Sequence, residues 1–251
     1  MIPYFGSETY GFLGLTFRTW GTFVALGFIV ATIIAWRRAK ARGLNAKIIT
    51  DLAFWLLLGG IVGARLFHVL FYEPAYYARH LWEILDLRQP GFAMFGGYLA
   101  AATAFLVYTR RKSLDVLAYA DVVAWSLPWG IWLGRLGCFL IHDHPGTATN
   151  FFLGVRYPDG VVRHDLGLDL SLLGLATGLL FLILDRWPRS RGFWLGVFLL
   201  IEGLSRFLLD FLRAADARYF GLTPTQFLAV PLAVWGIYLL FKSKILNPKS
   251  K

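Results

Sequence analysis

Runs of about 20 apolar residues recur along the chain, and short polar segments separate them. An α-helix rises about 1.5 Å per residue, so such a run crosses the roughly 30 Å hydrocarbon core of a bilayer. Stretches such as FVALGFIVATIIAW lack the apolar–polar alternation of membrane β-strands. The pattern therefore predicts an all-α membrane protein with about seven transmembrane helices. The expected helices cover residues 19–36, 49–71, 91–109, 115–141, 167–185, 192–213 and 224–242.

Basic residues gather in alternate connections between these helices and in the C-terminal tail. Cytoplasmic segments carry an excess of Lys and Arg, so we expect this side to face the cytoplasm and the N-terminus to lie outside. An odd number of spans satisfies that pattern. We expect one polytopic domain over residues 1–251, with a small outer (periplasmic) head loop at about 142–166. The basic residues are Arg37, Arg38, Lys40, Arg42, Lys47, Arg110, Arg111, Lys112, Arg186, Arg189, Arg191, Lys242, Lys244, Lys249 and Lys251.

Composition supports the membrane class, and it argues against a nucleic-acid-binding protein and against a protein built on disulfides or cysteine metal clusters. Hydrophobic residues make up 57% of the chain and charged residues 16%, against roughly 45–50% and about 25% in soluble domains. The net charge of +10 follows from the membrane orientation, so the expected partner is the membrane and nucleic acid is not expected. The single cysteine, Cys138, excludes an internal disulfide and a cluster of cysteine ligands. Flanked by glycine and apolar residues, it is expected to be a packing residue.

Ionisable residues inside the expected helices need a partner or a function, because each costs about 2.5–3.5 kcal/mol on membrane insertion. Asp121 and Arg135 share one helical face. Mutual neutralisation in a packing network is one interpretation, and it is the simpler one for Asp121 and Asp210. Spacings of four, four and three place a further set on one face of the sixth helix, directed to the bundle interior: Glu202, Arg206, Asp210 and Arg213.

Three arginines, Arg65, Arg135 and Arg206, lie in the outer halves of their helices and favour a second interpretation. A guanidinium group matches phosphate geometry, and a cavity open to lipid would admit a phospholipid headgroup. We therefore predict that these arginines bind an anionic phospholipid, with Glu202 and Asp210 as the neighbouring acids.

Glycines mark close approaches within the helices. Gly96 and Gly97 form a pair inside GFAMFGGYLAA, and GRLGCF brackets Arg135 with glycines. Glycine allows another backbone or a ligand to come close. Helix packing is the simpler interpretation for either pair, and a place in the substrate site is the alternative for Gly96 and Gly97.

Histidines gather in the outer segments: His68, His80, His142, His144 and His164. The run His142-Asp143-His144 and the pair His164-Asp165 could serve as acid–base groups or metal ligands. Solvated polar residues of a loop are the simpler interpretation. We expect no metal and no other cofactor.

Several segments together resemble the bacterial prolipoprotein diacylglyceryl transferase family over nearly the whole chain. They are GARLFHVLFYE at 63–73, the glycine pair at 96–97, GRLGCF at 134–139, GLSRFLLDFLRAAD at 203–216 and LTPTQFLAVPL at 222–232. The resemblance implies a multi-pass enzyme of the bacterial inner (cytoplasmic) membrane. It would transfer the diacylglyceryl group of phosphatidylglycerol to the thiol of a lipobox cysteine in a lipoprotein precursor, releasing glycerol phosphate.

The resemblance also assigns residues. Arg135 and Arg206 match the two arginines that hold the phospholipid phosphate, and Asp143 stands where the family usually has Glu. Further family charges match Asp121, Asp210, Arg213 and Asp216. The chain departs from the family pattern at four places: Phe95 replaces a histidine, Cys138 an asparagine and Glu202 a tyrosine, and RHDLGLD at 163–169 lacks the family's Pro, Gln and Tyr.

The departures bear on the removal of the acceptor's proton. Phe95 cannot act as a base, so His142, His144 and His164 are the candidate bases, oriented by Asp143 or Asp165. The leading prediction is the family's transferase activity. A transferase with the same donor and another acceptor, and a non-catalytic protein that binds phospholipid or lipoprotein precursors, are the alternatives.

Overall fold

The computed structural model describes residues 1–86, 91–214 and 218–246 and forms two compact units. The first unit comprises residues 1–35 and 120–251, and the second comprises residues 36–119. Long helices occupy all seven predicted positions. They are α1 (Thr19–Ala41), α2 (Ala46–Phe71), α4 (Met94–Arg111), α5 (Val116–Ile141), α6 (Leu166–Leu184), α7 (Phe193–Leu209) and α8 (Pro224–Leu246).

Five of these helices are long and apolar enough to cross a membrane, namely α1, α2, α5, α6 and α8. The predicted all-α membrane class is thereby supported. Helix α7 has 17 residues and continues into the short 3-10 helix η2 (Asp210–Leu212), so the stretch predicted as one span at 192–213 changes geometry at Asp210. The predicted number of seven spans and their orientation stay predictions.

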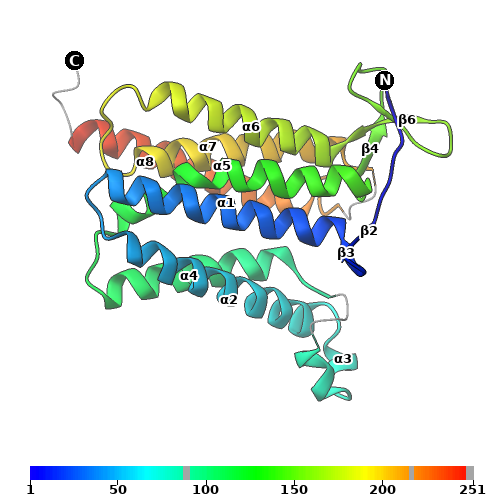
Figure 1. Ribbon diagram of the computed structural model, residues 1–251, viewed down its shortest axis with the longest axis horizontal. Helices are drawn as coiled ribbons and strands as arrows, with labels where there is room; N and C mark the ends of the chain where they lie inside the picture. Colours follow the sequence, from blue (N-terminus) through cyan, green and yellow to red (C-terminus); the bar gives the residue numbers. More distant parts are fainter. Residues whose placement is uncertain (87–90, 215–217, 247–251) are drawn as a thin grey trace. The chain divides into compact units, whose positions relative to one another are not determined.

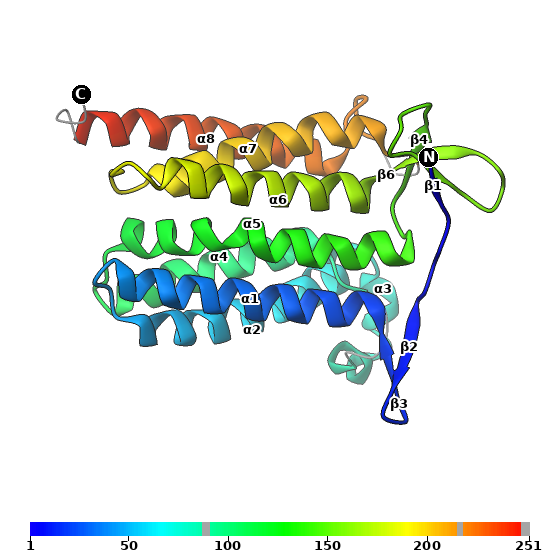
Figure 2. The same cartoon turned by 45° about the horizontal axis from the view of Figure 1, so that its top comes forward.

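In the first unit, α5, α6, α7 and α8 run alongside one another (Figures 1 and 2). Glycines allow the backbones of these helices to come close to one another, as expected where helices associate in lipid through small residues. A Cβ added at Gly203 of α7 would lie 2.7 Å from the carbonyl oxygen of Ala229 in α8. A Cβ added at Gly174 of α6 would lie 2.8 Å from the amide nitrogen of Trp132 in α5. Both positions therefore require glycine for close packing.

A four-stranded sheet caps one end of these helices (Figure 2). The strand order is β1-β5-β6-β4, and β1 from the N-terminus pairs in parallel with β5. The predicted head loop at 142–166 therefore contains three short strands instead of an irregular loop. The strands are β1 (Ile2–Pro3), β4 (Pro145–Ala148), β5 (Val155–Arg156) and β6 (Val162–Asp165); a separate hairpin joins β2 (Thr9–Phe12) to β3 (Leu15–Arg18).

The core of this head joins the sheet to the helices beneath it. Phe139 of α5, Val155 of β5 and Leu168 of α6 form one buried cluster. Helix α5 therefore ends, and α6 begins, at positions fixed by the head. The polar residues close to these two helix ends are therefore held in fixed positions as well.

The second unit pairs α2 with α4 and adds the short helices α3 (Pro74–Tyr77) and η1 (Leu81–Leu85). A Cβ added at Gly63 of α2 would lie 2.6 Å from the carbonyl oxygen of Gly96 in α4, and one added at Gly97 would lie 3.1 Å from that of Gly60. The glycine pair predicted to be close to substrate therefore lies in the contact between α2 and α4. These contacts support the packing interpretation.

Candidate active site

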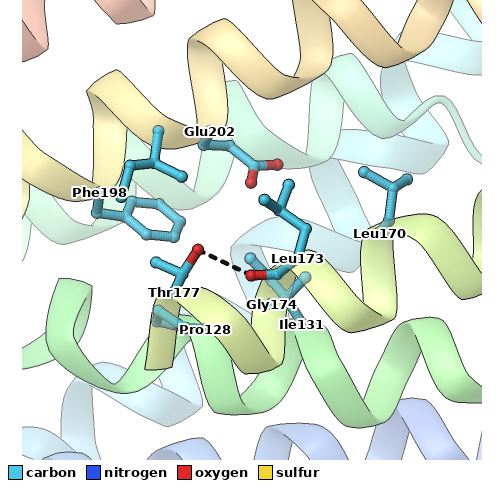
Figure 3. Close-up of a pocket in the computed structure, with 9 residues that line it drawn as sticks. Pro128, Ile131, Leu170, Leu173, Gly174, Thr177, Phe198 and Glu202 are labelled. Carbon is cyan, nitrogen blue, oxygen red and sulfur yellow. Dashed lines mark hydrogen bonds between the residues drawn. The ribbon is translucent and has the colours of Figure 1, made fainter. Parts of the chain in front are cut away.

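A small pocket opens between α5, α6 and α7 in the first unit (Figure 3). It has room for roughly one water molecule. Figure 3 shows the Glu202 carboxylate directed toward this space, and Thr177 donates a hydrogen bond to the carbonyl oxygen of Leu173 over 2.8 Å. The other lining residues are apolar: Pro128, Ile131, Leu170, Leu173, Gly174, Phe198 and Ile201.

The two arginines assigned to phosphate follow the pocket-lining residues by one helical turn. Arg206 lies four residues after Glu202 on α7, and Arg135 lies four residues after Ile131 on α5. Both helices run toward the end that carries the head sheet (Figure 2). Helical periodicity therefore puts Arg135 and Arg206 on the same faces of α5 and α7 as these lining residues, one turn nearer the head.

Glu202 and Arg206 form an ion pair, as their spacing of four suggested. Arg206 Nε donates to Glu202 Oε1 over 2.7 Å, and both side chains are largely buried. A buried arginine with an ionisable partner beside a pocket can exchange that partner for another anion. Glu202 therefore belongs to the site as the neighbour of Arg206.

Asp210 fastens the end of α7 to the start of α8. Thr223 donates its hydroxyl to Asp210 Oδ2 over 2.6 Å, and Arg213 Nε lies 3.0 Å from Asp210 Oδ1. Gln226 completes the junction: its Oε1 accepts from the Thr223 amide, and its side-chain nitrogen donates to the Phe207 carbonyl. Asp210 was predicted to contact substrate, but these bonds support the packing interpretation.

His142 is paired with Asp165 inside the head. His142 Nδ1 lies 2.7 Å from Asp165 Oδ2, and neither side chain has exposed surface. Asp165 also accepts from the Tyr157 hydroxyl over 3.0 Å and caps α6 through the Leu168 amide over 3.1 Å. Burial against the Asp165 carboxylate raises the pKa of Tyr157 strongly. His142 therefore takes part in a buried polar cluster and presents no exposed side-chain surface to a reactant.

Asp143, His144 and Cys138 meet at the end of α5. His144 Nδ1 bonds to Asp143 Oδ1, and the Cys138 sulfur lies close to both side chains. The Asp143 carboxylate, followed by the neighbouring Cys138, raises the pKa of His144 to about 9. One thiol, one carboxylate and one imidazole nitrogen lie within 4.8 Å of one another, which is a donor set for a metal ion.

His164 lies beside Asp169, at 3.6 Å between Nδ1 and Oδ2. The sequence suggested the adjacent Asp165 as its partner, but the structure pairs Asp165 with His142 instead. Asp169 was missed because β6 ends at Asp165 and α6 begins at once, which brings a residue one turn into the helix back toward the strand. His164 retains about a fifth of its side-chain exposure and remains open to a reactant.

Arg65, in the second unit, donates to backbone carbonyls. Its Nε donates to Ile84, Nη1 to Gly91, and Nη2 to Glu83 and Asp86, at 2.6–3.2 Å. These bonds hold η1, Asp86 and Gly91 against α2. The contacts give Arg65 a structural role, and its predicted contact with phospholipid has no support among them.

Asp121 caps another helix. Its two carboxylate oxygens accept from the amides of Gly192 and Leu195 at 2.7 and 2.9 Å, at the start of α7. The packing interpretation for Asp121 agrees with this geometry. Asp216 lies outside the described residues.

Helices long and apolar enough to cross a membrane, with the buried Arg206–Glu202 ion pair beside a pocket, define a multi-helix membrane protein. The chain matches the family described as prolipoprotein diacylglyceryl transferase over residues 10–242. It belongs to that family.

Curated relatives carry the name phosphatidylglycerol–prolipoprotein diacylglyceryl transferase. The protein of Roseobacter denitrificans is 32% identical, over 88% of this chain and 89% of the relative. That of Nitrosomonas europaea is 33% identical over 90% and 86%. That of Geobacter sulfurreducens is 34% identical over 90% and 88%. The suspected family is confirmed.

Proposed function

We propose that the protein transfers the diacylglyceryl group of phosphatidylglycerol to the thiol of a lipobox cysteine in a lipoprotein precursor. Family membership over residues 10–242 supports the reaction. The proposal rests most directly on the buried Arg206–Glu202 ion pair, in which Glu202 lines the pocket, with Arg135 one helical turn after the lining residue Ile131 on α5. This arrangement supplies the fixed cations that the departing phosphate requires.

Arg135 and Arg206 hold the phosphate of the donor lipid. Negative charge grows on the glycerol phosphate as its bond to the diacylglyceryl carbon breaks. Arginine donors fixed in a dry site stabilise that charge, and the loss of one such donor costs about 100- to 1,000-fold in rate. Glu202 orients Arg206 before the lipid arrives and releases part of its guanidinium to the phosphate. The small pocket must widen, and lipid chains entering between α5, α6 and α7 would widen it.

The acceptor thiol must lose its proton, and three histidines were the candidates. His142 is buried beside Asp165, and His144 Nδ1 is bonded to Asp143. His164 is partly exposed and lies beside Asp169. Among these three histidines we therefore assign His164 as the base.

The protein works at the outer face of the bacterial inner membrane as a multi-pass protein. The alternation of basic loops supports seven spans with the N-terminus outside and the C-terminus in the cytoplasm. The head sheet then lies on the periplasmic side, where lipoprotein precursors emerge. Residues 1–251 act as one polytopic domain in this proposal.

A different acceptor is the second candidate, and the departures from the family pattern favour it. Phe95 replaces the family histidine and Glu202 the family tyrosine, whereas Arg135 and Arg206 are retained. The protein would then still bind phosphatidylglycerol as the donor. The attacking nucleophile would belong to a lipid, a sugar or an atypical peptide. A protein that binds phospholipid or precursor without transfer is the remaining alternative.

The test is release of glycerol phosphate by the purified protein in phosphatidylglycerol vesicles. A lipobox peptide and its Cys→Ser analogue are the matched acceptors. Release that requires the cysteine peptide supports the transferase. Release with both peptides or with neither, while phosphatidylglycerol is still bound, would favour another acceptor or a binding role.

A further inference from the structure

The last turn of α5 and the residues after it bring three different donor groups together. Cys138 lies in that turn and is buried, whereas Asp143 and His144 are partly exposed. His142 ends the helix in the left-handed conformation, at φ 51°, and its amide bonds back to the Phe139 carbonyl at 3.2 Å. This turn folds Asp143 and His144 back onto Cys138, since all three donor atoms lie within 4.8 Å of one another.

The donor set matches zinc. Zinc binds thiolate at about 2.3 Å and imidazole or carboxylate at about 2.0–2.2 Å in tetrahedral geometry, so its ligands lie roughly 3.3–3.8 Å apart. Small side-chain rotations would bring these three atoms to that separation. Without an ion, Asp143 and His144 bond to each other. Three protein ligands with a fourth position open is the arrangement of catalytic zinc sites, whereas structural sites are closed by four.

We propose that Cys138, Asp143 and His144 bind a zinc ion whose fourth position takes the thiolate of the acceptor cysteine. The inference rests on the proposed function and deepens it by naming how the acceptor is held. Arg135 lies three residues before Cys138, on the same side of α5. The acceptor sulfur and the donor phosphate would then be held at neighbouring points along one helix.

The ion would supply what Phe95 cannot. In this proposal the zinc ion replaces the role given above to His164, because a thiol bound to a metal loses its proton outright, and here the proton goes to solvent. The sulfur electron pair then attacks the diacylglyceryl carbon, a C–S bond forms, and the C–O bond to the phosphate breaks. Glycerol phosphate leaves with that electron pair, held by Arg135 and Arg206. The thioether product is a neutral ligand and leaves the zinc. No oxidant or reductant is needed.

Cobalt substitution tests the site without any transfer reaction. Co²⁺ is added to the metal-free protein in detergent, with no phosphatidylglycerol present. Because Cys138 is the only cysteine in the chain, a thiolate-to-cobalt absorption band before peptide is added identifies Cys138 as a ligand. We expect this band in the wild type and its loss in Cys138→Ser. His144→Ala should weaken cobalt binding by about 10- to 100-fold, whereas His80→Ala, a control at an exposed histidine of the second unit, should bind as the wild type does.

The lipobox peptide then tests the fourth position. Adding it should raise the thiolate band about twofold as a second sulfur joins the ion, and its Cys→Ser analogue should leave the band unchanged. Folded protein without a cobalt band, or a band that ignores the cysteine peptide, would overturn the proposal. Glycerol phosphate release is measured separately, so loss of transfer with the peptide response intact would contradict the proposed function and not the metal site.

Discussion

Two buried arginines on long helices show how differently one side chain can be used. Arg65 in the second unit is 3% exposed and Arg206 in the first is 5% exposed. Arg65 donates to four backbone carbonyls of a following segment, whereas Arg206 is bound to the Glu202 carboxylate beside a pocket. Carbonyls in a folded segment cannot leave without unfolding it, but a carboxylate can yield to a phosphate. The chemistry of the partner, more than burial, separates the structural arginine from the one that we propose binds phosphate.

The largest effect expected from this comparison is at Arg206. Arg206→Ala should lower the transfer rate about 100- to 1,000-fold, because one fixed donor to the developing phosphate charge is lost. Arg206→Lys should recover part of the rate, since it keeps the charge without the planar fork. Rates with phosphatidylglycerol and peptide, normalised to folded protein, give the measurement. A rate loss no larger than that of Arg65→Ala would remove the distinction.

Arg65→Ala should act on stability instead. Several carbonyls lose a charged donor, and the expected loss of unfolding free energy is about 1.5–3 kcal/mol. The melting temperature in detergent reports this change, and the transfer rate per folded molecule should fall far less than in Arg206→Ala. An unchanged melting temperature with a collapsed rate would instead place Arg65 at the phospholipid, as the sequence suggested.

Asp121 gives a smaller and purely structural effect. Asp121→Ala removes the cap of α7 and should cost about 1 kcal/mol of stability. Asp121→Asn keeps one accepting oxygen and should cost less. The two melting temperatures provide the check, with transfer per folded molecule unchanged in both. A large rate loss in Asp121→Asn would mean that the charge itself serves the reaction.

Glu202→Gln should have the smallest effect and the opposite sign. Without the competing carboxylate charge, Arg206 should bind phosphatidylglycerol about two- to fivefold more tightly, in line with the roughly 1 kcal/mol that ion pairs contribute. Equilibrium binding to vesicles measures the change, with neutral lipid vesicles as the control. Weaker binding in Glu202→Gln would show that the orientation of Arg206 by Glu202 matters more than the competition of Glu202 with the phosphate.

Hydrophobic runs located the helices well because lipid-spanning segments leave a strong signal in sequence. They could not locate the head sheet, whose strands of two to four residues give almost no pattern and pair with a strand from the N-terminus. Spacing along one helix correctly paired Glu202 with Arg206.

Side-chain contacts between residues on different helices and strands could not be predicted from the sequence. Nothing in the sequence links His142 to Asp165, or Asp121 to the start of α7, because those contacts depend on where chain turns bring distant residues. The same limit hid the grouping of Cys138 with Asp143 and His144. It depends on the left-handed turn at His142, where no glycine marks the position.

Phosphate binding by Arg135 and Arg206 is tested most directly by the mass of a lipobox peptide. The peptide is incubated with phosphatidylglycerol and with the wild type, Arg135→Ala or Arg206→Ala in turn. We expect a diacylglyceryl adduct on the cysteine with the wild type, and a rate of adduct formation about 100- to 1,000-fold lower with either variant. An adduct formed at the wild-type rate by both variants would contradict the claim that this arginine pair holds the departing phosphate.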